Sequence, residues 1–335
     1  MNHRKTFIVA ELSANHNQDF ELAAKTLEAM VASGADAVKV QTYKPESLVL
    51  DIDNKYFGKI QNGLWQGLKR YELYKMAATP YEWHPKLQQI AKKLGLVFFS
   101  TPFDFEAVDL LESMDVPMYK IASFEINDIP LIKYVARLGK PIIFSTGCAD
   151  IDDINLAIDT CRKETNDRIS LLKCTSEYPA SYEQANLLTI PDMKNRFNFP
   201  VGVSDHTLGS IVPLTAVALG AEIVEKHFIL DRSLGGADSQ FSMEPDEFKN
   251  MVDNIRNMEK VFGEIKYDIT EKERLKRRSL FASEDIRKGD VFSDKNVRSL
   301  RPGYGLHPRF YDMLIGKMSN RNIPKGEPLE EIDLC

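Results

Sequence analysis

The chain has 335 residues, of which 43% are hydrophobic and 27% charged, a composition that excludes disordered and fibrous proteins. Its 43 basic and 49 acidic residues give a net charge of -6, so we expect no nucleic-acid partner and no anionic membrane surface. No run approaches the roughly 20 apolar residues that cross a bilayer, and small molecules are the expected partners.

Eight short apolar runs recur along the chain, each followed by a polar residue and then by a helical pattern. They predict strands at 7–11, 37–41, 96–101, 118–123, 141–146, 170–175, 200–206 and 222–227. Phe20, Leu27 and Met30 share one face of the first intervening helix, and another helix is predicted to begin at Thr79 with a side-chain cap. Strands that alternate with helices run parallel, and eight such units favour an α/β fold of the (β/α)8 TIM barrel type.

The C-terminal part has a different pattern. A final helix is expected from Pro245 to about Phe262, and a charged connector without barrel periodicity follows it. We therefore predict a barrel domain at 1–265, a linker at 266–279 and a small, turn-rich β domain at 280–335. The basic run 272–278 has no interleaved aromatic residues, so we interpret it as solvated linker and not as a nucleic-acid site.

Cysteine usage and the start of the chain indicate the compartment. The apolar run from Phe7 to Ala10 is too short for a signal peptide, and none of the cysteines forms a C-x-x-C pair. The cysteines are Cys148, Cys161, Cys174 and Cys335. These features predict a cytoplasmic protein with reduced thiols.

Polar residues cluster where the predicted strands end. They are Glu11, Lys39, Gln41, Thr101, Lys120, Ser123, Ser145, Ser204, His206 and His227. The carboxyl ends of barrel strands meet at one face, and barrel enzymes carry their chemistry there.

His206 and His227 end predicted strands that would be neighbours in a barrel, and neutral imidazoles are common ligands of divalent transition metals. Asp205, Glu225 and Asp238 are nearby carboxylates, and such mixed ligation suits Mn, Fe or Zn. The alternative interpretation is that each histidine is a satisfied core or surface residue.

Two lysines, Lys39 and Lys120, lie inside apolar runs, where an unpaired ammonium group is costly to bury. Their partner is either an anionic ligand or a carboxylate such as Glu125. Glu11 is either an acid, a base or a sugar-orienting group, or it forms a salt bridge with one of these lysines. The hydroxyls nearby, including Ser176, would bind phosphate oxygens or cap the following helices.

Nine motifs in register resemble the sialic acid synthase family along nearly the whole chain. They are IVAELSANHNQ (8–18), AVKVQTY (37–43), FSTPFD (99–104), YKIASFE (119–125), STG (145–147), CTSEYP (174–179), SDHT (204–207), EKHF (225–228) and RPGYG (301–305). The resemblance implies a phosphoenolpyruvate-binding barrel and a C-terminal antifreeze-like (SAF) domain. It also implies a domain-swapped homodimer in which that domain caps the partner's site.

The resemblance also implies roles for individual residues. Mn2+ would be bound by His206 and His227, and catalysis would involve Glu11, Glu125 and Asp238. Phosphoenolpyruvate would be bound by Lys39, Thr101, Lys120, Ser123, Ser145, Ser176 and Ser204. The sugar would be bound by Gln41, Tyr178, Asp238 and Arg301. Ser176 departs from the family, which has asparagine at this position.

The segment 230–245 and the opening motif resemble the branch of the family that makes pseudaminic acid. The implied reaction condenses phosphoenolpyruvate, water and 2,4-diacetamido-2,4,6-trideoxy-altrose, a diacetamido hexose, to a nine-carbon keto acid and phosphate. A 6-deoxy sugar needs apolar surroundings, for which Tyr43, Phe124, Tyr178 and Phe241 are candidates. The alternatives are the legionaminic or N-acetylneuraminate branch, a class II metal-dependent aldolase, and a non-catalytic sugar-binding or ice-binding protein.

Overall fold

The computed structural model describes residues 5–334, so residues 1–4 and Cys335 of the predicted domains lie outside it. The chain divides into two compact units, Met1–Gly263 and Glu264–Cys335, and each is described by itself. The range predicted as linker, 266–279, contains a short helix, α11 (Glu271–Leu275).

The first unit is a closed barrel of eight parallel strands that neighbour one another in chain order. The strands are β1 (Phe7–Glu11), β2 (Ala37–Thr42), β3 (Val97–Pro102), β4 (Tyr119–Ile121), β5 (Ile142–Ser145), β6 (Ile169–Cys174), β7 (Val201–Asp205) and β8 (Ile223–His227). The prediction of a (β/α)8 barrel is therefore confirmed, and each predicted strand overlaps the observed one.

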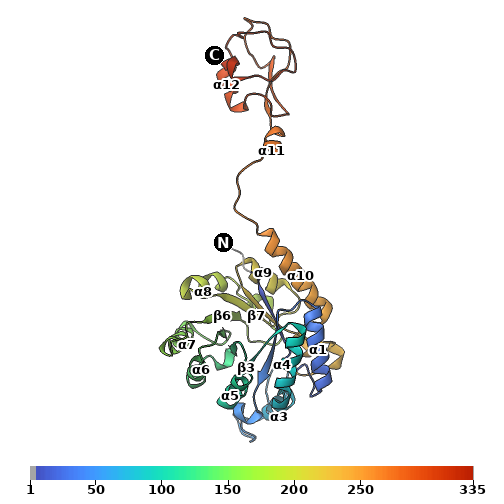
Figure 1. Cartoon of the computed structure of the whole chain (residues 1–335), viewed down its shortest axis with the longest axis vertical. Helices are drawn as coiled ribbons and strands as arrows, with labels where there is room; N and C mark the ends of the chain where they lie inside the picture. Colours follow the sequence, from blue (N-terminus) through green and yellow to red (C-terminus); the bar gives the residue numbers. More distant parts are fainter. Residues whose placement is uncertain (1–4, 335) are drawn as a thin grey trace. The chain divides into compact units, whose positions relative to one another are not determined.

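Helices surround the strands (Figure 1). They are α1 (Phe20–Ala32), α2 (Pro45–Leu48), α3 (Arg70–Ala77), α4 (His84–Leu94), α5 (Phe105–Ser113), α6 (Ile129–Ala136), α7 (Ile151–Lys163), α8 (Thr189–Phe197), α9 (Ile211–Ala218) and α10 (Pro245–Val261). Short 3-10 turns are η1 (Tyr81–Trp83), η2 (Ser123–Glu125), η3 (Tyr182–Gln184), η4 (Arg232–Leu234) and η5 (Ser239–Phe241). The apolar face predicted for the first helix is buried at Leu27 and Met30, whereas Phe20 is only partly buried.

The cap predicted at Thr79 was wrong. The chain there forms η1 and then α4, and neither has a side-chain hydrogen bond at its N-cap. The Thr79 hydroxyl instead lies 3.3 Å from Nε2 of His16, which is 63 residues away in sequence. A tertiary contact has replaced the local one.

Side chains of the strands alternate between the helix layer and the barrel interior. On β1, for example, Ile8 and Ala10 pack with the helices, whereas Val9 packs inside. The apolar layer inside the barrel consists of Val9, Ala37, Phe99, Ile143, Leu172 and Ile223. Two residues further along the same strands, the inward positions are Glu11, Lys39, Thr101, Ser145, Cys174 and Glu225. A polar layer therefore lies directly above an apolar one.

The second unit has a separate small core. Its antiparallel strands are β9 (Ser279–Ala282) and β10 (Val297–Leu300), followed by η6 (Pro308–Phe310), α12 (Tyr311–Leu314) and η7 (Glu331–Leu334). Ile286 and Ile323 exchange backbone hydrogen bonds of 2.9 and 2.7 Å, which joins two similar Gly-containing turns. The unit has little regular structure, as the sequence predicts.

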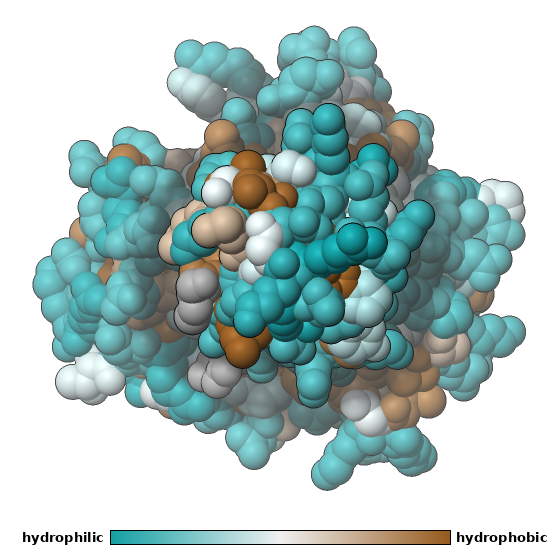
Figure 2. Space-filling model, turned by 90° about the horizontal axis from the view of Figure 1, so that it is seen from above, coloured by the Kyte–Doolittle hydropathy of each residue, from teal (hydrophilic) through white to brown (hydrophobic). Residues whose placement is uncertain are grey.

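Across the described residues, the structure contains no helix with the length and apolarity needed to cross a bilayer. The face shown in Figure 2 is mostly hydrophilic, and its hydrophobic residues form small separate patches.

Candidate active site at the barrel mouth

A buried cluster of four charged side chains occupies the barrel mouth. Glu11 and Lys39 are register partners on β1 and β2 and form an ion pair. The Glu225 Oε1 atom accepts a 3.0 Å hydrogen bond from Lys120 Nζ and lies 3.7 Å from Lys39 Nζ. Ser204 also donates to this oxygen, at 3.0 Å, and Lys39 donates to the Thr101 hydroxyl at 3.2 Å. Glu225 therefore joins both lysines in one network.

Burial opposes the charge of each member of this cluster, but the opposite charges compensate in part. Burial would raise the pKa of Glu225, yet Lys120 and Lys39 lower it to about 2. Burial also outweighs the effect of Lys39 at Glu11, whose pKa is raised. The pKa of Lys120 is lowered, chiefly by burial. The pKa of Lys39 is raised, because two carboxylates outweigh its burial.

Hydroxyl groups and a glycine lie beside the cluster, at the ends of β4, β5 and β6. The Ser123 hydroxyl accepts a 3.1 Å hydrogen bond from the Gly147 amide. A Cβ atom on Gly147 would lie only 2.3 Å from the Ser176 hydroxyl oxygen, so no other residue fits there without displacing it. The Ser145 hydroxyl is buried and has no hydrogen-bond partner among the described residues. These polar atoms are available to an oxygen-rich ligand.

The two predicted metal ligands lie together. The rings of His206 and His227 are 5.2 Å apart between centroids, and Tyr178 packs 4.4 Å from the His206 ring. His206 Nδ1 lies 2.8 Å from the Thr175 carbonyl oxygen and must donate to it, so Nε2 is the nitrogen that could bind a metal when the ring is neutral. Burial lowers the pKa of His206, but its contacts with Cys174 and the Thr175 carbonyl outweigh burial and raise it. His227 Nδ1 is buried without a hydrogen-bond partner, 3.4 Å from Asp238 Oδ2.

These donor atoms fit a divalent metal held by two imidazoles. Within residues 5–334, no group of three or more His, Cys, Asp or Glu side chains has an arrangement that would hold a metal ion. Among the described residues, a metal at this place would therefore have no more than the two imidazoles as candidate ligands.

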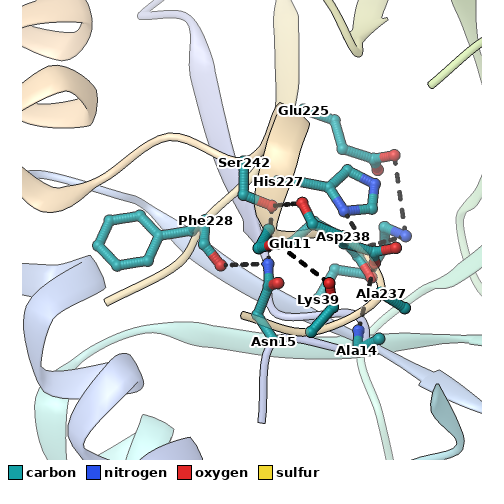
Figure 3. Close-up of polar contacts among 12 residues, drawn as sticks. Glu11, Ala14, Asn15, Lys39, Glu225, His227, Phe228, Ala237, Asp238 and Ser242 are labelled. Carbon is teal, nitrogen blue, oxygen red and sulfur yellow. Dashed lines mark hydrogen bonds and ion pairs between the residues drawn. The ribbon is translucent and has the colours of Figure 1, made fainter. Parts of the chain in front are cut away.

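Loops after β1 and β8 hold Asp238 against His227 (Figure 3). The Ala14 amide donates to Asp238 Oδ2 at 3.3 Å, and the Ser242 hydroxyl donates to the Asp238 carbonyl at 2.7 Å. The Asn15 amide group donates to Ser242 Oγ at 2.8 Å and to the Phe228 carbonyl at 2.9 Å. These hydrogen bonds therefore hold the loops after β1 and β8 together beside His227.

Two of the carboxylates considered as metal ligands have other partners. Asp205 points away from the barrel interior and pairs with Lys226 in the outer layer, because both residues occupy outward positions on their strands. Glu225 faces inward but binds the lysines. Glu11 forms a salt bridge with Lys39, which was the alternative interpretation of this residue. The carboxylate that pairs with Lys120 is Glu225, not Glu125.

The structure gives fewer contacts for the remaining residues that the sequence predicted for the site. Gln41 is half-buried on β2, opposite Thr101 in register. Glu125 lies on η2, with its Oε2 atom buried and without a hydrogen-bond partner. Arg301 is exposed in the second unit, and the structure does not relate it to the barrel.

Some residues of the site were not predicted from the sequence. Cys174 ends β6 facing inward, and its thiol lies 3.7 Å from the Ser176 hydroxyl oxygen and hydrogen-bonds to His206. Burial alone would raise the pKa of Cys174, but the contacts with His206, Ser123 and Lys120 together outweigh burial and lower the pKa from 9.0 to about 7. Strand alternation counted from Leu172 would have placed this thiol in the site. No local signal would have identified Asn15 and Ser242, since they meet across 227 residues.

Comparisons with known proteins agree with this geometry. A model of the NeuB family matches residues 26–267, and a model of the SAF domain matches residues 277–334. A pseudaminic acid synthase from Helicobacter pylori is 47% identical over 98% of this chain and 97% of its own length. An N,N'-diacetyllegionaminic acid synthase from Legionella pneumophila is 39% identical over 96% of this chain and 93% of its own length.

A solved structure supports the same assignment. The N-acetylneuraminic acid (sialic acid) synthetase from Leptospira borgpetersenii, crystallised with citrate, superposes with a TM-score of 0.72 at 33% identity. The match covers 81% of this chain and 90% of that one. The similarity is thus greater to the pseudaminic acid synthase than to the legionaminic relative, as the sequence motifs predicted.

We predict that Glu125 makes the stability of the barrel depend on pH. Burial raises the pKa of Glu125 from 4.5 to about 7, and Asp128 adds to the shift. Between these values the folded chain keeps a proton that the unfolded chain has released, so stability falls as the pH rises. Glu125→Gln should lack this pH dependence. Relative to wild type, its free energy of unfolding should therefore increase by up to about 1.4 kcal/mol per pH unit across this range.

Urea unfolding of the wild type and of Glu125→Gln across that pH range measures the difference. Glu28→Gln on the exposed face of α1 is the matched control and should follow the wild type. Parallel curves for all three proteins would show that Glu125 does not retain a proton in the folded state.

Proposed function

This chain belongs to the NeuB family, and from that premise we propose that it condenses phosphoenolpyruvate with 2,4-diacetamido-2,4,6-trideoxy-altrose and water to form pseudaminic acid and phosphate. The observation that carries the proposal is the convergence of two buried lysines and two imidazoles at one barrel mouth. An aldolase would not need two buried ammonium groups beside a set of hydroxyls, and a non-catalytic protein would leave all of them without a role.

Phosphoenolpyruvate would bind where the lysines and hydroxyls meet. Lys39 and Lys120 would donate charge-assisted hydrogen bonds to its oxygens, as lysine does in other phosphate sites. The hydroxyls of Thr101, Ser123, Ser145, Ser176 and Ser204 would donate hydrogen bonds to its oxygens. Support comes from the unpartnered Ser145 hydroxyl and from Gly147, whose lack of a side chain lets the Ser123 and Ser176 hydroxyls approach its backbone closely.

His206 and His227 would hold a divalent metal, for which Mn2+ is our choice. The metal would supply Lewis-acid polarisation of the open-chain sugar's aldehyde. Asp238 would orient His227 or a water molecule beside it, since its carboxylate is already fixed by the Ala14 amide. Tyr178 and Gln41 would contact the sugar.

The residues of the site would then direct the bond changes. The methylene carbon of phosphoenolpyruvate attacks the aldehyde carbon, the aldehyde oxygen gains a proton, and water adds to the cation that forms at C2. The C–O bond to phosphate then breaks and leaves a keto acid. Glu125 suits the proton transfers, because its pKa is near neutrality and its Oε2 atom has no partner. Glu11 would orient Lys39 and the reacting atoms.

We place the enzyme in the cytoplasm as a domain-swapped homodimer in which Arg301 reaches the sugar in the partner's barrel. The free thiols of Cys148, Cys161 and Cys174 support a reducing compartment. Arg301 belongs to the second compact unit, Glu264–Cys335, and the resemblance to the sialic acid synthase family is what assigns it to the partner's site.

Phosphate release from phosphoenolpyruvate tests the proposed reaction. It should require both a divalent metal and the diacetamido hexose, and mass spectrometry should detect a nine-carbon keto acid. N-acetylmannosamine is the comparison sugar and should react far more slowly. Equal rates with N-acetylmannosamine would assign the chain to another branch, and no release with any amino sugar would refute the proposed reaction.

Removing the Lys120 ammonium group should weaken phosphoenolpyruvate binding. Lys120→Met keeps the chain length but loses a charge-assisted contact, so KM for phosphoenolpyruvate should rise at least about tenfold. Lys133→Met, which removes a half-exposed lysine from α6, should change KM little.

Ser145→Ala removes a hydroxyl without a partner, and should raise KM for phosphoenolpyruvate without lowering the thermal midpoint of unfolding. An unchanged KM in both site variants would show that neither residue contacts the substrate.

A mixed dimer tests whether Arg301 acts across subunits. One chain carries Arg301→Ala and the other His227→Ala, and each homodimer alone should be nearly inactive. If the arginine serves the partner's barrel, the mixed dimer contains one intact site and should recover about half the wild-type activity per dimer. Activity no higher than in the homodimers would place Arg301 with its own barrel.

A further inference from the structure

An apolar pocket of about 410 Å³ lies beside the barrel mouth and has no role in the reaction as described so far. Its apolar wall comes from the long loop after β2 and from α3, and its inner wall from the loops after β1 and β8. The lining residues that matter here are Leu64, Trp65, Leu68, Leu73, Met76 and Ala237.

Contacts of Trp65 link the wall of the pocket to His206 and to the residues beside His227. The Trp65 indole donates a 2.9 Å hydrogen bond to the carbonyl oxygen of Ala237, the residue before Asp238. The Trp65 ring also packs 5.6 Å from Tyr178, which in turn packs on His206. In Figure 3, Ala14 and Ala237, which both line the pocket, lie next to Asp238. The pocket and the two histidines therefore lie on opposite sides of one wall, to which Trp65 and Ala237 contribute.

Most polar side chains of the pocket are already occupied by the backbone. The Asn17 amide group donates to the carbonyls of Leu234 and Gly235, and the Gln18 amide group donates to those of Met76 and Ala78. A hydroxyl group in contact with the apolar wall would find no hydrogen-bonding partner in the side chains of Leu64, Leu68 and Leu73. The pocket thus favours an apolar substituent.

The aromatic residues proposed from the sequence do not form this surface. Tyr43 is buried against Tyr74 and Phe103, and Phe124 is 59% exposed on η2. Phe241 packs on both histidines and shapes the metal pair, where Tyr178 joins it. The loop after β2 supplies the apolar wall instead.

We propose that this pocket binds the C6 methyl end of the open-chain sugar, with Trp65 and Met76 as its specificity-determining residues. The inference rests on the proposed function, which places the aldehyde end of the sugar at His206 and His227. The opposite end of the molecule then points along Asp238 and Ala237 to the apolar wall. An enzyme with this wall selects a 6-deoxy sugar over one that carries a hydroxyl group on C6.

Kinetics with a matched pair of sugars test the assignment. They are the 2,4-diacetamido-2,4,6-trideoxy hexose and the same sugar with a hydroxyl on C6. Wild type should prefer the deoxy sugar in kcat/KM by about tenfold or more, the scale of one apolar group in a pocket. Met76→Gln and Trp65→Ala should reduce this preference at least about threefold and leave KM for phosphoenolpyruvate unchanged. Tyr56→Ala, an exposed aromatic of the same loop outside the pocket, is the control.

Direct binding separates this inference from the reaction itself. The chain has two tryptophans, and Trp83 packs against His16 and Phe20, away from the pocket lining. Adding the deoxy sugar should change the intrinsic fluorescence of Trp83→Phe, which retains Trp65, but not that of Trp65→Phe. Circular dichroism confirms that each variant is folded.

The outcomes have distinct meanings. A sugar-dependent signal from Trp65 without phosphate release would refute the proposed function and support the pocket. Phosphate release with an unchanged sugar preference in Met76→Gln and Trp65→Ala would overturn the pocket and leave the reaction intact. A signal that persists in Trp65→Phe and is lost in Trp83→Phe would also overturn the pocket assignment.

Discussion

The site depends on a buried network in which two glutamates neutralise two lysines inside an otherwise apolar barrel. Glu225 is its centre, because one carboxylate oxygen contacts Lys120 and Ser204 and lies near Lys39. Ions in such a place are costly unless each is paired, so the network constrains every strand that contributes to it. The parallel register, which aligns Glu11 with Lys39 on one side and with His227 on the other, satisfies this constraint.

Some polar atoms of the site have no hydrogen-bond partner, and these are the atoms that a substrate would contact. The second oxygen of Glu225, the hydroxyl of Ser145 and Nδ1 of His227 are buried without hydrogen-bond partners among the described residues. Unsatisfied buried polar atoms reduce stability, and in native structures a water molecule, an ion or a ligand can complete them. The strand ends thus combine a neutral ion network with free donors and acceptors for a charged ligand.

The two sides of the site are built differently. The residues proposed to bind phosphoenolpyruvate lie at strand ends, whose positions are set by barrel register. The proposed sugar pocket is formed by loops, in which Asn15 and Ser242 fix Asp238 and Trp65 donates to the Ala237 carbonyl. Loops change sequence more readily than barrel strands, so a change of sugar preference would need no change in the barrel itself.

The sequence by itself determined the barrel, because eight apolar runs that alternate with helical segments have few other ways to bury their strands. It also determined which face carries the chemistry: Lys39, Lys120 and both histidines follow from strand-end position. The tertiary structure decided the partners. Glu225 joins the lysines while Asp205 turns outward to Lys226, a difference set by strand alternation and register. The Thr79 hydroxyl, the Asn15–Ser242 contact and the Trp65 pocket depend on segments far apart in sequence, and local patterns carry no information about such contacts.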